Sequence, residues 1–511
     1  MAERSGVEFE EQRLAKAESL QNEGITLYPS AYNKTHTMRE VLTEYKDAVH
    51  DPSASKVSVA GRIYAVRDHG NTLFMDLRDE SEAIQIFIKK NSLPEGLFSK
   101  IKKSVERGDI IGVVGPVFRT KLGEISIWAE EITVLTKSLF TLPEKFHGLT
   151  NPEKRYRQRY VDLIVNEDVR ETFTTRSRLI SNVRRIMEDK GFLEFETPIL
   201  QPVYGGANAR PFTTHHNFLD QTLFLRIAPE LYLKRLIVGG FEKVFEIAKN
   251  FRNEDIDTSH NPEFTTIELY WAYVDYHAMM QITEEVITEA ILSTCNTSKL
   301  TFNGTEISFE RPWHRVSMQE AVRDMGGVDI FSLSMEELIK QGKEIGIDPK
   351  KLDAATNQRE MMLLYFDALV EEKLIQPTFI YGYPVENSPL AKRDPEQEGF
   401  VERFELFIAG MELANGFSEL NDPVDQLKRF EKQEELRRLG NEEAAMNDYD
   451  FVTALGYGLP PTGGVGIGID RLVMLATGHN SIKEVLLFPS MKSESIQTEE
   501  EQTSEMETDN A

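Results

Sequence analysis

The sequence predicts an α+β protein in which a small N-terminal β-barrel precedes a larger antiparallel sheet flanked by helices. Three observations support this prediction. Five alternating apolar and polar segments follow one another between Lys56 and Leu135, with one short helical stretch after the third. The aperiodic segment TLPEKFHGLTNPEKRYRQRY then marks a joint. Beyond it, strand patterns are joined by short turns rather than by regular helical crossovers, which favours antiparallel pairing over a Rossmann-type fold.

These features divide the 511 residues into three parts. Residues 1–145 hold an N-terminal helix and the barrel, and residues 146–492 form the large domain, with a helical segment near 318–375. Residues 493–511, SESIQTEEEQTSEMETDNA, form an acidic tail without aromatic residues. Such a composition cannot bury a core, so we expect the tail to be disordered.

Composition describes an ordinary globular chain, with 40% hydrophobic and 28% charged residues. No apolar run approaches the roughly 20 residues that a membrane helix needs, and the N-terminus lacks the pattern of a secretory signal. We therefore expect a cytoplasmic protein that makes no membrane contact. The single cysteine, Cys295, excludes an internal disulfide and a metal site built from cysteines.

The net charge of -26 argues, taken alone, against binding of nucleic acid, because phosphate contacts rely on Lys and Arg. The acidic residues are unevenly spread, however, and two basic stretches remain. RNA could contact either of them, although each also fits an ordinary solvated surface. Their basic residues are Lys100, Lys102, Lys103 and Arg107 in the first stretch and Lys154, Arg155, Arg157 and Arg159 in the second.

The segment KVFEIAKNFRNEDIDTSHNPEFTTIELYWAY predicts a long hairpin, because two alternating runs flank a polar loop. Residues two apart on a strand share a face, so Arg252 and Glu254 are expected to point together, as are Glu268 and Tyr270 on the returning strand. The opposite positions are apolar. The charged face is therefore expected to be either solvent-exposed or the wall of a pocket.

A second segment, VERFELFIAGMELANGFSEL, places Glu405 and Glu412 on either side of an Ala409–Gly410 turn, where their carboxylates can converge. Two converging acids need a counter-cation, and Mg²⁺ held by carboxylates and substrate phosphates is the natural candidate. A solvated hairpin edge is the alternative. The residues that follow at every second position share one face, namely Asn415, Phe417 and Glu419.

The third segment, PTGGVGIGIDRLVML, runs from a strand into a helix and matches no phosphate-binding glycine motif well. Gly464, Gly466 and Gly468 alternate along the strand and leave one face bare. A flat group such as adenine could lie there, with Arg471 at the start of the helix reaching a phosphate oxygen. A close-packed strand is the alternative.

Taken in order, these segments resemble the three signature motifs of class II aminoacyl-tRNA synthetases: GFLEFETPIL with Pro198, FRNE with its hairpin, and GIGIDR. The barrel, joined through YRQRYVDL, resembles the OB-fold of the lysine, aspartate and asparagine subgroup. Within that subgroup, GGANARPFTTHHNFLDQTLFLRIAPELYLKRLIVGGFEKVFEI and ELANGFSELND are similar to the lysyl enzymes. Only the acidic tail lies outside the resemblance, and Asp255 stands where the family commonly has glycine.

The resemblance implies a lysine–tRNA ligase. Such an enzyme activates L-lysine with ATP to lysyl-adenylate and pyrophosphate, and then transfers lysine to the 3′ end of tRNA(Lys) for translation. Mg²⁺ is the implied cofactor and ATP a substrate. A homodimer is implied as well, because GFLEFETP resembles the motif that forms the subunit interface in this class.

The resemblance also implies roles for individual residues. The implied lysine-binding residues are Gly206 and Glu230 for the α-amino group, Arg252 and Asn415 for the carboxylate, Glu268, Tyr270 and Glu419 for the ε-ammonium, and Phe417. The implied ATP-binding residues are Arg252, Glu254, His260, Phe264, Glu405, Gly468 and Arg471. Adenine would stack on Phe264. Glu405 and Glu412 would bind magnesium, and Arg252 and Arg471 would act in catalysis. The implied anticodon readers are Arg67, Phe74 and Gln85.

Physical reasoning agrees with a lysine substrate. A buried ammonium must be paired with carboxylates, and a pocket with several acids and no local lysine would reject aspartate by repulsion. Three alternatives remain: a ligase for aspartate or asparagine, a related lysine ligase that acts on a protein and lacks the barrel, and an inactive tRNA-binding paralogue. The acids of the pocket argue against the first alternative, and the barrel argues against the second. The complete set of ATP and magnesium positions argues against the third. In the barrel, Phe74 could also be a core residue.

Overall fold

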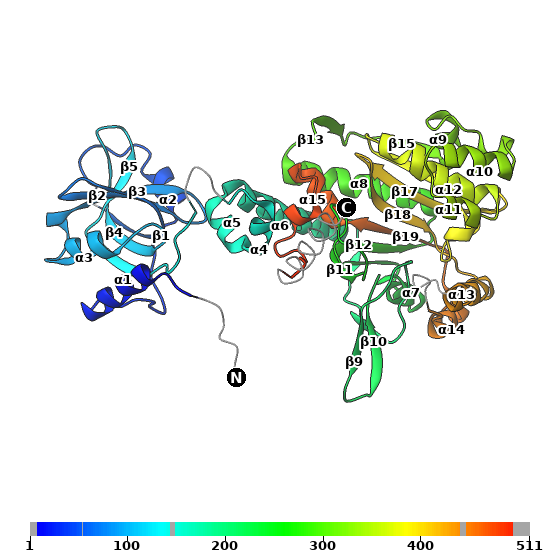
Figure 1. Cartoon of the computed structure of the whole chain (residues 1–511), viewed down its shortest axis with the longest axis horizontal. Coiled ribbons are helices and arrows are strands. Elements are labelled where there is room, and N and C mark those ends of the chain that lie inside the picture. The colour runs from blue at the N-terminus through cyan, green and yellow to red at the C-terminus, as the bar shows by residue number, and fades with distance from the viewer. Residues whose placement is uncertain (1–7, 54, 144–148, 440–445, 494–511) are drawn as a thin grey trace, which may run out of the picture. The chain divides into compact units, whose positions relative to one another are not determined.

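The computed structural model describes residues 8–53, 55–143, 149–439 and 446–493. The chain divides into two compact units, Met1–Leu149 and Thr150–Ala511 (Figure 1). The expected domain boundary after residue 145 and all but the first residue of the acidic tail lie outside the described residues. Among the residues that are described, no helix is both long enough and apolar enough to span a membrane.

The first unit is built on a closed five-stranded barrel, as the sequence predicted. Its strands are ordered β1-β2-β3-β5-β4, and β4 also pairs with β1, which closes the barrel. The barrel strands are β1 (Lys56–Asp68), β2 (Thr72–Arg78), β3 (Ala83–Lys89), β4 (Ile110–Arg119) and β5 (Ile125–Trp128). The helical elements of this unit are α1 (Glu11–Asn22), α2 (Met38–Glu44), η1 (Lys90–Ser92) and α3 (Leu97–Ser104).

The fifth expected strand is in fact two strands, β5 and β6 (Glu131–Thr136). The backbone N–H of Ala129 bonds to β3 and that of Glu130 bonds to β4. The chain therefore leaves its parallel neighbour β3 at this point, because β5 pairs with both β3 and β4 whereas β6 pairs with β4. Apolar alternation continues through this change, so the sequence pattern does not reveal the break.

An eight-stranded sheet forms the centre of the second unit, in the order β15-β16-β17-β18-β19-β12-β11-β7. The six central strands are antiparallel, as expected, but β15 runs parallel to β16 and β7 runs parallel to β11. The sheet is therefore mixed at both edges. Its strands are β7 (Leu193–Glu194), β11 (Lys243–Phe251), β12 (Glu263–Ala272), β15 (His314–Ser317), β16 (Thr378–Pro384), β17 (Phe400–Ile408), β18 (Met411–Ser418) and β19 (Thr462–Gly468).

Smaller elements surround this sheet (Figure 1). The short strands are β8 (Leu200–Gln201), β9 (Thr213–His216), β10 (Gln221–Leu225), β13 (Lys299–Phe302) and β14 (Thr305–Ser308). The α-helices are α4 (Pro152–Arg157), α5 (Arg159–Val165), α6 (Glu167–Asp189), α7 (Glu230–Val238), α8 (Tyr276–Cys295), α9 (Met318–Asp324), α10 (Met335–Glu344), α11 (Pro349–Ala354), α12 (Gln358–Leu369), α13 (Pro423–Arg438), α14 (Tyr449–Gly458), α15 (Ile469–Thr477) and α16 (Ile482–Val485). The 3-10 turns are η2 (Ile330–Ser332), η3 (Glu371–Lys373) and η4 (Val385–Asn387).

The two faces of the sheet have different roles. On one face, Phe245, Ile267 and Leu269 are fully buried in a core that α6, α8 and α15 cover. Because side chains alternate along a strand, the neighbouring positions Glu268 and Tyr270 point to the other face. The charged face of β12 is thus turned to the interior of the unit and forms the wall of a cavity, so the solvent-exposed alternative is excluded.

Candidate active site

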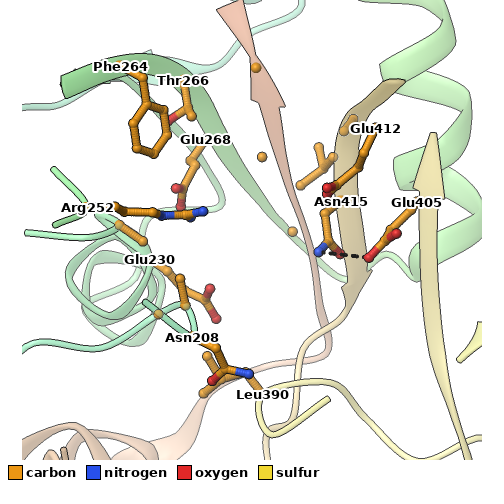
Figure 2. A pocket seen from close by; sticks show the side chains of 18 of the residues that line it. Asn208, Glu230, Arg252, Phe264, Thr266, Glu268, Leu390, Glu405, Glu412 and Asn415 are labelled. Atoms are coloured by element: carbon orange, nitrogen blue, oxygen red, sulfur yellow. Dashed lines mark hydrogen bonds between the residues drawn. The ribbon is translucent and has the colours of Figure 1, made fainter. Parts of the chain in front are cut away.

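One cavity of about 450 Å³ lies on this face of the sheet. Its volume is in the range of small-molecule sites. Figure 2 shows Arg252 and Glu268 on one side and Glu405, Glu412 and Asn415 on the other. Every site residue that the sequence predicted in the second unit lines this cavity: Gly206, Glu230, Arg252, Glu254, His260, Phe264, Glu268, Tyr270, Glu405, Glu412, Asn415, Phe417, Glu419, Gly468 and Arg471.

Arg252 and Glu254 reach the cavity from a different local structure than expected. β11 ends at Phe251, so both residues belong to the loop that follows and do not alternate along a strand. The backbone N–H of Arg252 bonds to the carbonyl of Pro262, which closes the base of the hairpin. The loop geometry, rather than strand alternation, directs both side chains to the cavity.

Three buried carboxylates line one part of the cavity. They belong to Glu230 at the first turn of α7, to Glu268 on β12 and to Glu419 just after β18. The hydroxyl of Tyr270 donates a 3.0 Å hydrogen bond to Glu268. Burial, followed by the charge of Glu230, raises the pKa of Glu268 to about 8. No cation among the described residues is bonded to this carboxyl, which would ionise when an ammonium group is placed beside it.

Contrary to the expectation of an acidic pocket without a local lysine, Lys234 lies among these acids. Its Nζ donates to Oε1 of Glu230 at 2.5 Å and also pairs with Glu419. Sequence reasoning missed it, although Glu230 and Lys234 stand four apart on one helix, a spacing that brings side chains together. The sequence alone is equally consistent with Lys234 on the protein surface. Its exposed fraction of 1% in the structure shows that the side chain is buried.

Arg252 provides an anion-binding group in the same cavity. Its guanidinium carbon lies 5.0 Å from the centroid of the Phe264 ring, a cation–π geometry. Its buried Nε has no hydrogen-bond partner among the described residues. A buried N–H without a partner is costly, so a ligand oxygen at this position would be stabilised. The pair thus offers a cation and an aromatic face to one ligand.

Glu405 and Glu412 lie near the β17–β18 turn, where Ala409 and Gly410 both have positive φ angles of 55° and 72°. Positive φ at two central residues is the geometry of a type I′ hairpin turn. Burial, then the charge of Glu412, raises the pKa of Glu405 to about 7. A site that raises a carboxyl pKa through a second acid is one that a cation would stabilise.

Arg403 is a second residue that sequence reasoning missed. It donates to Oε1 of Glu405 at 2.6 Å and to Oδ1 of Asn415 at 3.1 Å, and it lines the cavity. Arg403 stands two residues before Glu405 on β17, so strand alternation could have found it. Within the described part of the chain, no group of three or more His, Cys, Asp or Glu side chains is placed to hold a metal ion.

The alternating glycines of β19 lie opposite the functional residues of β12. Gly464 pairs with Tyr270, Gly466 with Glu268, and Gly468 with Thr266. A Cβ atom at Gly464 would stand 2.0 Å from Oε1 of Glu419, whereas one at Gly466 would have no neighbour nearer than 3.5 Å. The sequence predicted a strand face without side chains, open to a ligand. At Gly464, however, the carboxylate of Glu419 fills this space.

Arg471 and His260 lie together at another part of the cavity wall. A terminal nitrogen of Arg471 lies 3.3 Å from Nε2 of His260, and the other pairs with the backbone carbonyl of Glu412. Nδ1 of His260 lies 2.8 Å from a carboxylate oxygen of Asp257. This arrangement presents a cation beside Glu412, whose carboxylate lies 3.8 Å from Arg471, and suits a polyanionic ligand that carries a metal ion.

In the barrel, the residues expected to read an anticodon share one face of the sheet. Arg67 stands opposite Phe74, which stands opposite Phe87. Phe74 is half-buried, and its ring lies 5.2 Å from that of Phe87, so it is part of an aromatic surface. Arg67 is exposed and paired with Asp76. Gln85 is buried, and its amide is bonded to Glu124 and Ser126, so it is less available than expected.

The aromatic surface of the barrel extends beyond the expected residues. Phe87 also stands opposite Trp128 on β5, and the two rings lie 4.8 Å apart. Sequence reasoning did not single out either residue, although both fall on outward positions of predicted strands. Aromatic side chains on the outer face of such a barrel are suited to stacking with unpaired bases.

Comparison with known proteins agrees with this geometry. Residues 151–492 match the family described as tRNA synthetases class II (D, K and N), and residues 57–135 match the OB-fold nucleic acid binding domain. A lysine–tRNA ligase of Methanospirillum hungatei is 64% identical over 494 residues, 97% of each chain. One of Carboxydothermus hydrogenoformans is 52% identical, covering 94% of this chain and 97% of its own length.

These matches span both units of the chain and nearly its whole length. The family model covers the segment that supplies every cavity-lining acid described above. Proteins that share 64% identity over 97% of each chain have the same fold. The chain therefore belongs to the class II aminoacyl-tRNA synthetases of the aspartate, lysine and asparagine group, in the family of the lysine–tRNA ligases.

Proposed function

We propose that this protein activates L-lysine with ATP and transfers it to the 3′ end of tRNA(Lys). The observation that carries the proposal is the buried cluster of Glu230, Glu268 and Glu419, in which Glu268 has no cation bonded to it among the residues that the structure describes. Buried carboxylates of this kind select a ligand that brings its own ammonium group. The ammonium group in the side chain distinguishes lysine from aspartate and asparagine, which have only the α-ammonium.

We propose an arrangement of lysine that uses residues lining the cavity. The ε-ammonium lies between Glu268, Tyr270 and Glu419, and the α-amino group lies beside Glu230 and the backbone at Gly206. Arg252 and Asn415 then hold the α-carboxylate. Because Arg252 also lies against Phe264, the proposed adenine site, it can contact both reactants and bring the carboxylate to the α-phosphate.

In the first step, an oxygen of the lysine carboxylate attacks the α-phosphorus of ATP in line, and pyrophosphate leaves. Arg252 neutralises charge on the transferring group, and Arg471, with His260, binds the departing phosphates. In the second step, a terminal ribose hydroxyl of tRNA attacks the adenylate carbonyl, and AMP leaves. The proposed chemistry needs no protein nucleophile, because both nucleophiles belong to substrates.

Magnesium fits the pair Glu405 and Glu412. Mg²⁺ prefers oxygen ligands and is commonly held by one or two carboxylates together with substrate phosphates, so a site of only two acids is sufficient. The raised pKa of Glu405 supports this assignment, since burial and the charge of Glu412 raise it and a bound cation would offset both effects. When bound, Mg²⁺ would neutralise charge on the phosphates. The hydrogen bond from Arg403 to Oε1 of Glu405 orients the Glu405 carboxylate.

We further propose that the barrel reads the anticodon, with Phe74 stacking on a base and Arg67 and Gln85 contacting base edges. The aromatic surface formed by Phe74, Phe87 and Trp128 supports this proposal. The reaction belongs to protein synthesis, and the proposed compartment is the cytoplasm.

A homodimer is proposed through the segment GFLEFETPIL and the hairpin of β9 and β10. Leu193, Ile199 and Leu200 in that segment are exposed, and Phe218 and Leu219 follow at the tip of the hairpin. Phe218 is 91% exposed. Exposed apolar side chains in both segments are what such an interface would bury. Sedimentation of the protein and of Leu200→Asp tests the proposal, which predicts a dimer that the substitution dissociates.

The test of the proposed function is ATP–pyrophosphate exchange with each standard amino acid, with and without Mg²⁺. Exchange is expected with lysine and only when Mg²⁺ is present. Glu268→Gln is expected to raise the KM for lysine by about a hundredfold, because it replaces a charged hydrogen-bonding partner of the ε-ammonium with a neutral one.

Glu263→Gln is the matched control. Glu263 is the first residue of the same strand, is exposed, and pairs with Lys249 outside the cavity. Its substitution is expected to leave the KM for lysine unchanged. Exchange that depends on another amino acid would refute the substrate assignment, and exchange with none would refute the proposed catalysis.

A further inference from the structure

Lys234 on α7 is a buried cation next to the proposed amino-acid site. It is 1% exposed and does not itself line the cavity. Its Nζ donates to Oε1 of Glu230 at 2.5 Å and pairs with Oε2 of Glu419. Three aromatic rings surround it, those of Tyr270, Phe417 and Phe451, with centroids 5.4 to 5.9 Å from Nζ.

The contacts of Lys234 determine which carboxylate oxygens remain for a ligand. One oxygen of Glu230 and one of Glu419 are engaged by Nζ. The other oxygen of Glu419, Oε1, is buried and has no hydrogen-bond partner among the described residues. That oxygen lies over Gly464, where a Cβ atom would stand only 2.0 Å away. Lys234 and Gly464 together fix the position of Glu419 Oε1.

The charge of Lys234 also sets the electrostatic balance of the site. Burial alone would lower the pKa of Lys234, but the charges of Glu230 and Glu419 outweigh it and raise that pKa, so the ammonium stays protonated. When a bound ammonium keeps Glu268 ionised, Glu230, Glu268 and Glu419 carry three negative charges against the two cations Lys234 and Arg252, which leaves one net negative charge among these five groups. Lysine carries one net positive charge at neutral pH. These five groups and a bound lysine are therefore neutral together only when Lys234 is present.

Stability of the fold does not by itself account for this cluster. Removing charges from water is unfavourable for each ion, and replacing a buried ionic triad with apolar residues is often neutral or stabilising. The site around Lys234 already contains apolar and aromatic partners that could pack against a methionine. A buried triad beside a substrate cavity is better explained by what it does for the ligand.

We propose that Lys234 is a positioning residue that determines amino-acid selectivity. It orients Glu230 and Glu419 towards the two ammonium groups of the substrate, and its charge limits the pocket to one net positive charge from the ligand. The inference rests on the proposed function, because it takes lysine as the ligand. Lys234 acts through the two acids and does not touch the substrate.

The test compares Lys234→Met and Lys234→Gln with the unaltered full-length protein in ATP–pyrophosphate exchange. Both variants are expected to raise the KM for lysine roughly tenfold or more, because Glu230 and Glu419 then take up a proton or lose their orientation. The KM for ATP and the kcat at saturating lysine are expected to change less than about threefold. Glutamine keeps N–H donors without charge, so it separates hydrogen bonding from charge balance.

Arg235→Met is the matched control. Arg235 is the next residue on the same helix, does not line the cavity, and forms a 2.8 Å ion pair with Asp448. The substitution is expected to lower the melting temperature without changing the KM for lysine. Three results would overturn the inference: an unchanged KM for lysine in folded Lys234 variants, an equal rise in the KM for ATP, or failure of both variants to fold, which would assign Lys234 a structural role.

Failure of the inference and failure of the proposed function are distinguishable. If the unaltered protein shows no exchange that depends on lysine, the proposed function is wrong. If it shows such exchange and the Lys234 variants keep its KM for lysine, only the inference is wrong.

Discussion

The hydroxyl of Tyr270 donates a 3.0 Å hydrogen bond to Oε2 of Glu268, two residues earlier on β12. The two side chains share the cavity face of the strand because they are separated by one full period of the pleat. This bond holds the Glu268 carboxylate without providing a positive charge. The charge of Glu268 therefore depends on what enters the cavity.

Lysine binding is expected to depend on pH through Glu268. Burial and the charge of Glu230 raise its pKa to about 8, so the carboxyl is largely protonated at neutral pH in the unliganded protein. An ammonium beside it favours the ionised form, so binding releases a proton. The KM for lysine should fall as pH rises from about 6 to about 8, by at most about tenfold per unit, and level off above that.

Exchange kinetics across this pH range test the prediction, and calorimetry in two buffers of different ionisation enthalpy counts the protons released. Glu268→Gln should show neither the pH dependence nor the proton release. A flat KM for lysine in the unaltered protein would mean that Glu268 is already ionised.

The magnesium requirement is expected to depend on Glu405. Glu405→Gln should increase the Mg²⁺ concentration needed for half-maximal exchange by about tenfold or more, because a hard cation loses one of two carboxylate ligands. Removal of Mg²⁺ by a chelator should abolish exchange. Because the pKa of Glu405 is raised to about 7, the unaltered protein should need more Mg²⁺ below about pH 7, where a proton competes with the metal ion.

Glu402→Gln serves as the control for that titration, since Glu402 lies on the same strand but does not line the cavity. An equal Mg²⁺ requirement for the Glu405 variant and this control would remove Glu405 from the proposed metal site.

Gly464→Ala should impair lysine binding, whereas Gly466→Ala should have a much smaller effect. An added Cβ at Gly464 would stand 2.0 Å from Glu419 and 2.6 Å from the Tyr270 ring, so both side chains must shift. At Gly466 the nearest atom is 3.5 Å away, an ordinary contact. We expect the KM for lysine to rise about tenfold or more in the first variant. Similar values for the two variants would contradict the packing described here.

Phe74→Ala should affect tRNA and not lysine activation. The KM for tRNA in aminoacylation should rise by roughly tenfold, since base–aromatic stacking contributes about 1–3 kcal/mol. Exchange requires no tRNA and should stay unchanged, which makes it an internal control. A loss of exchange would show that the substitution disturbs the fold, and an unchanged KM for tRNA would exclude Phe74 from the anticodon site.

Much of the candidate site could be predicted because its geometry is local. The convergence of Glu405 and Glu412 follows from a two-residue turn, and the shared face of Glu268 and Tyr270 follows from strand alternation. The apolar positions Ile267 and Leu269 predicted a buried opposite face, and they are fully buried. In each case, residues near in sequence are near in space through one regular element.

The sequence by itself determined the family, the barrel and sheet folds of the two units, and the cavity residues with proposed roles other than Arg403, because these depend on local patterns. Only the tertiary structure decided that Lys234 lies between Glu230 and Glu419, that the last barrel segment divides into β5 and β6, and that both sheet edges are parallel. These features depend on contacts between residues distant in the chain. Burial and pairing of a charge are properties of such contacts, and the order of residues does not specify them.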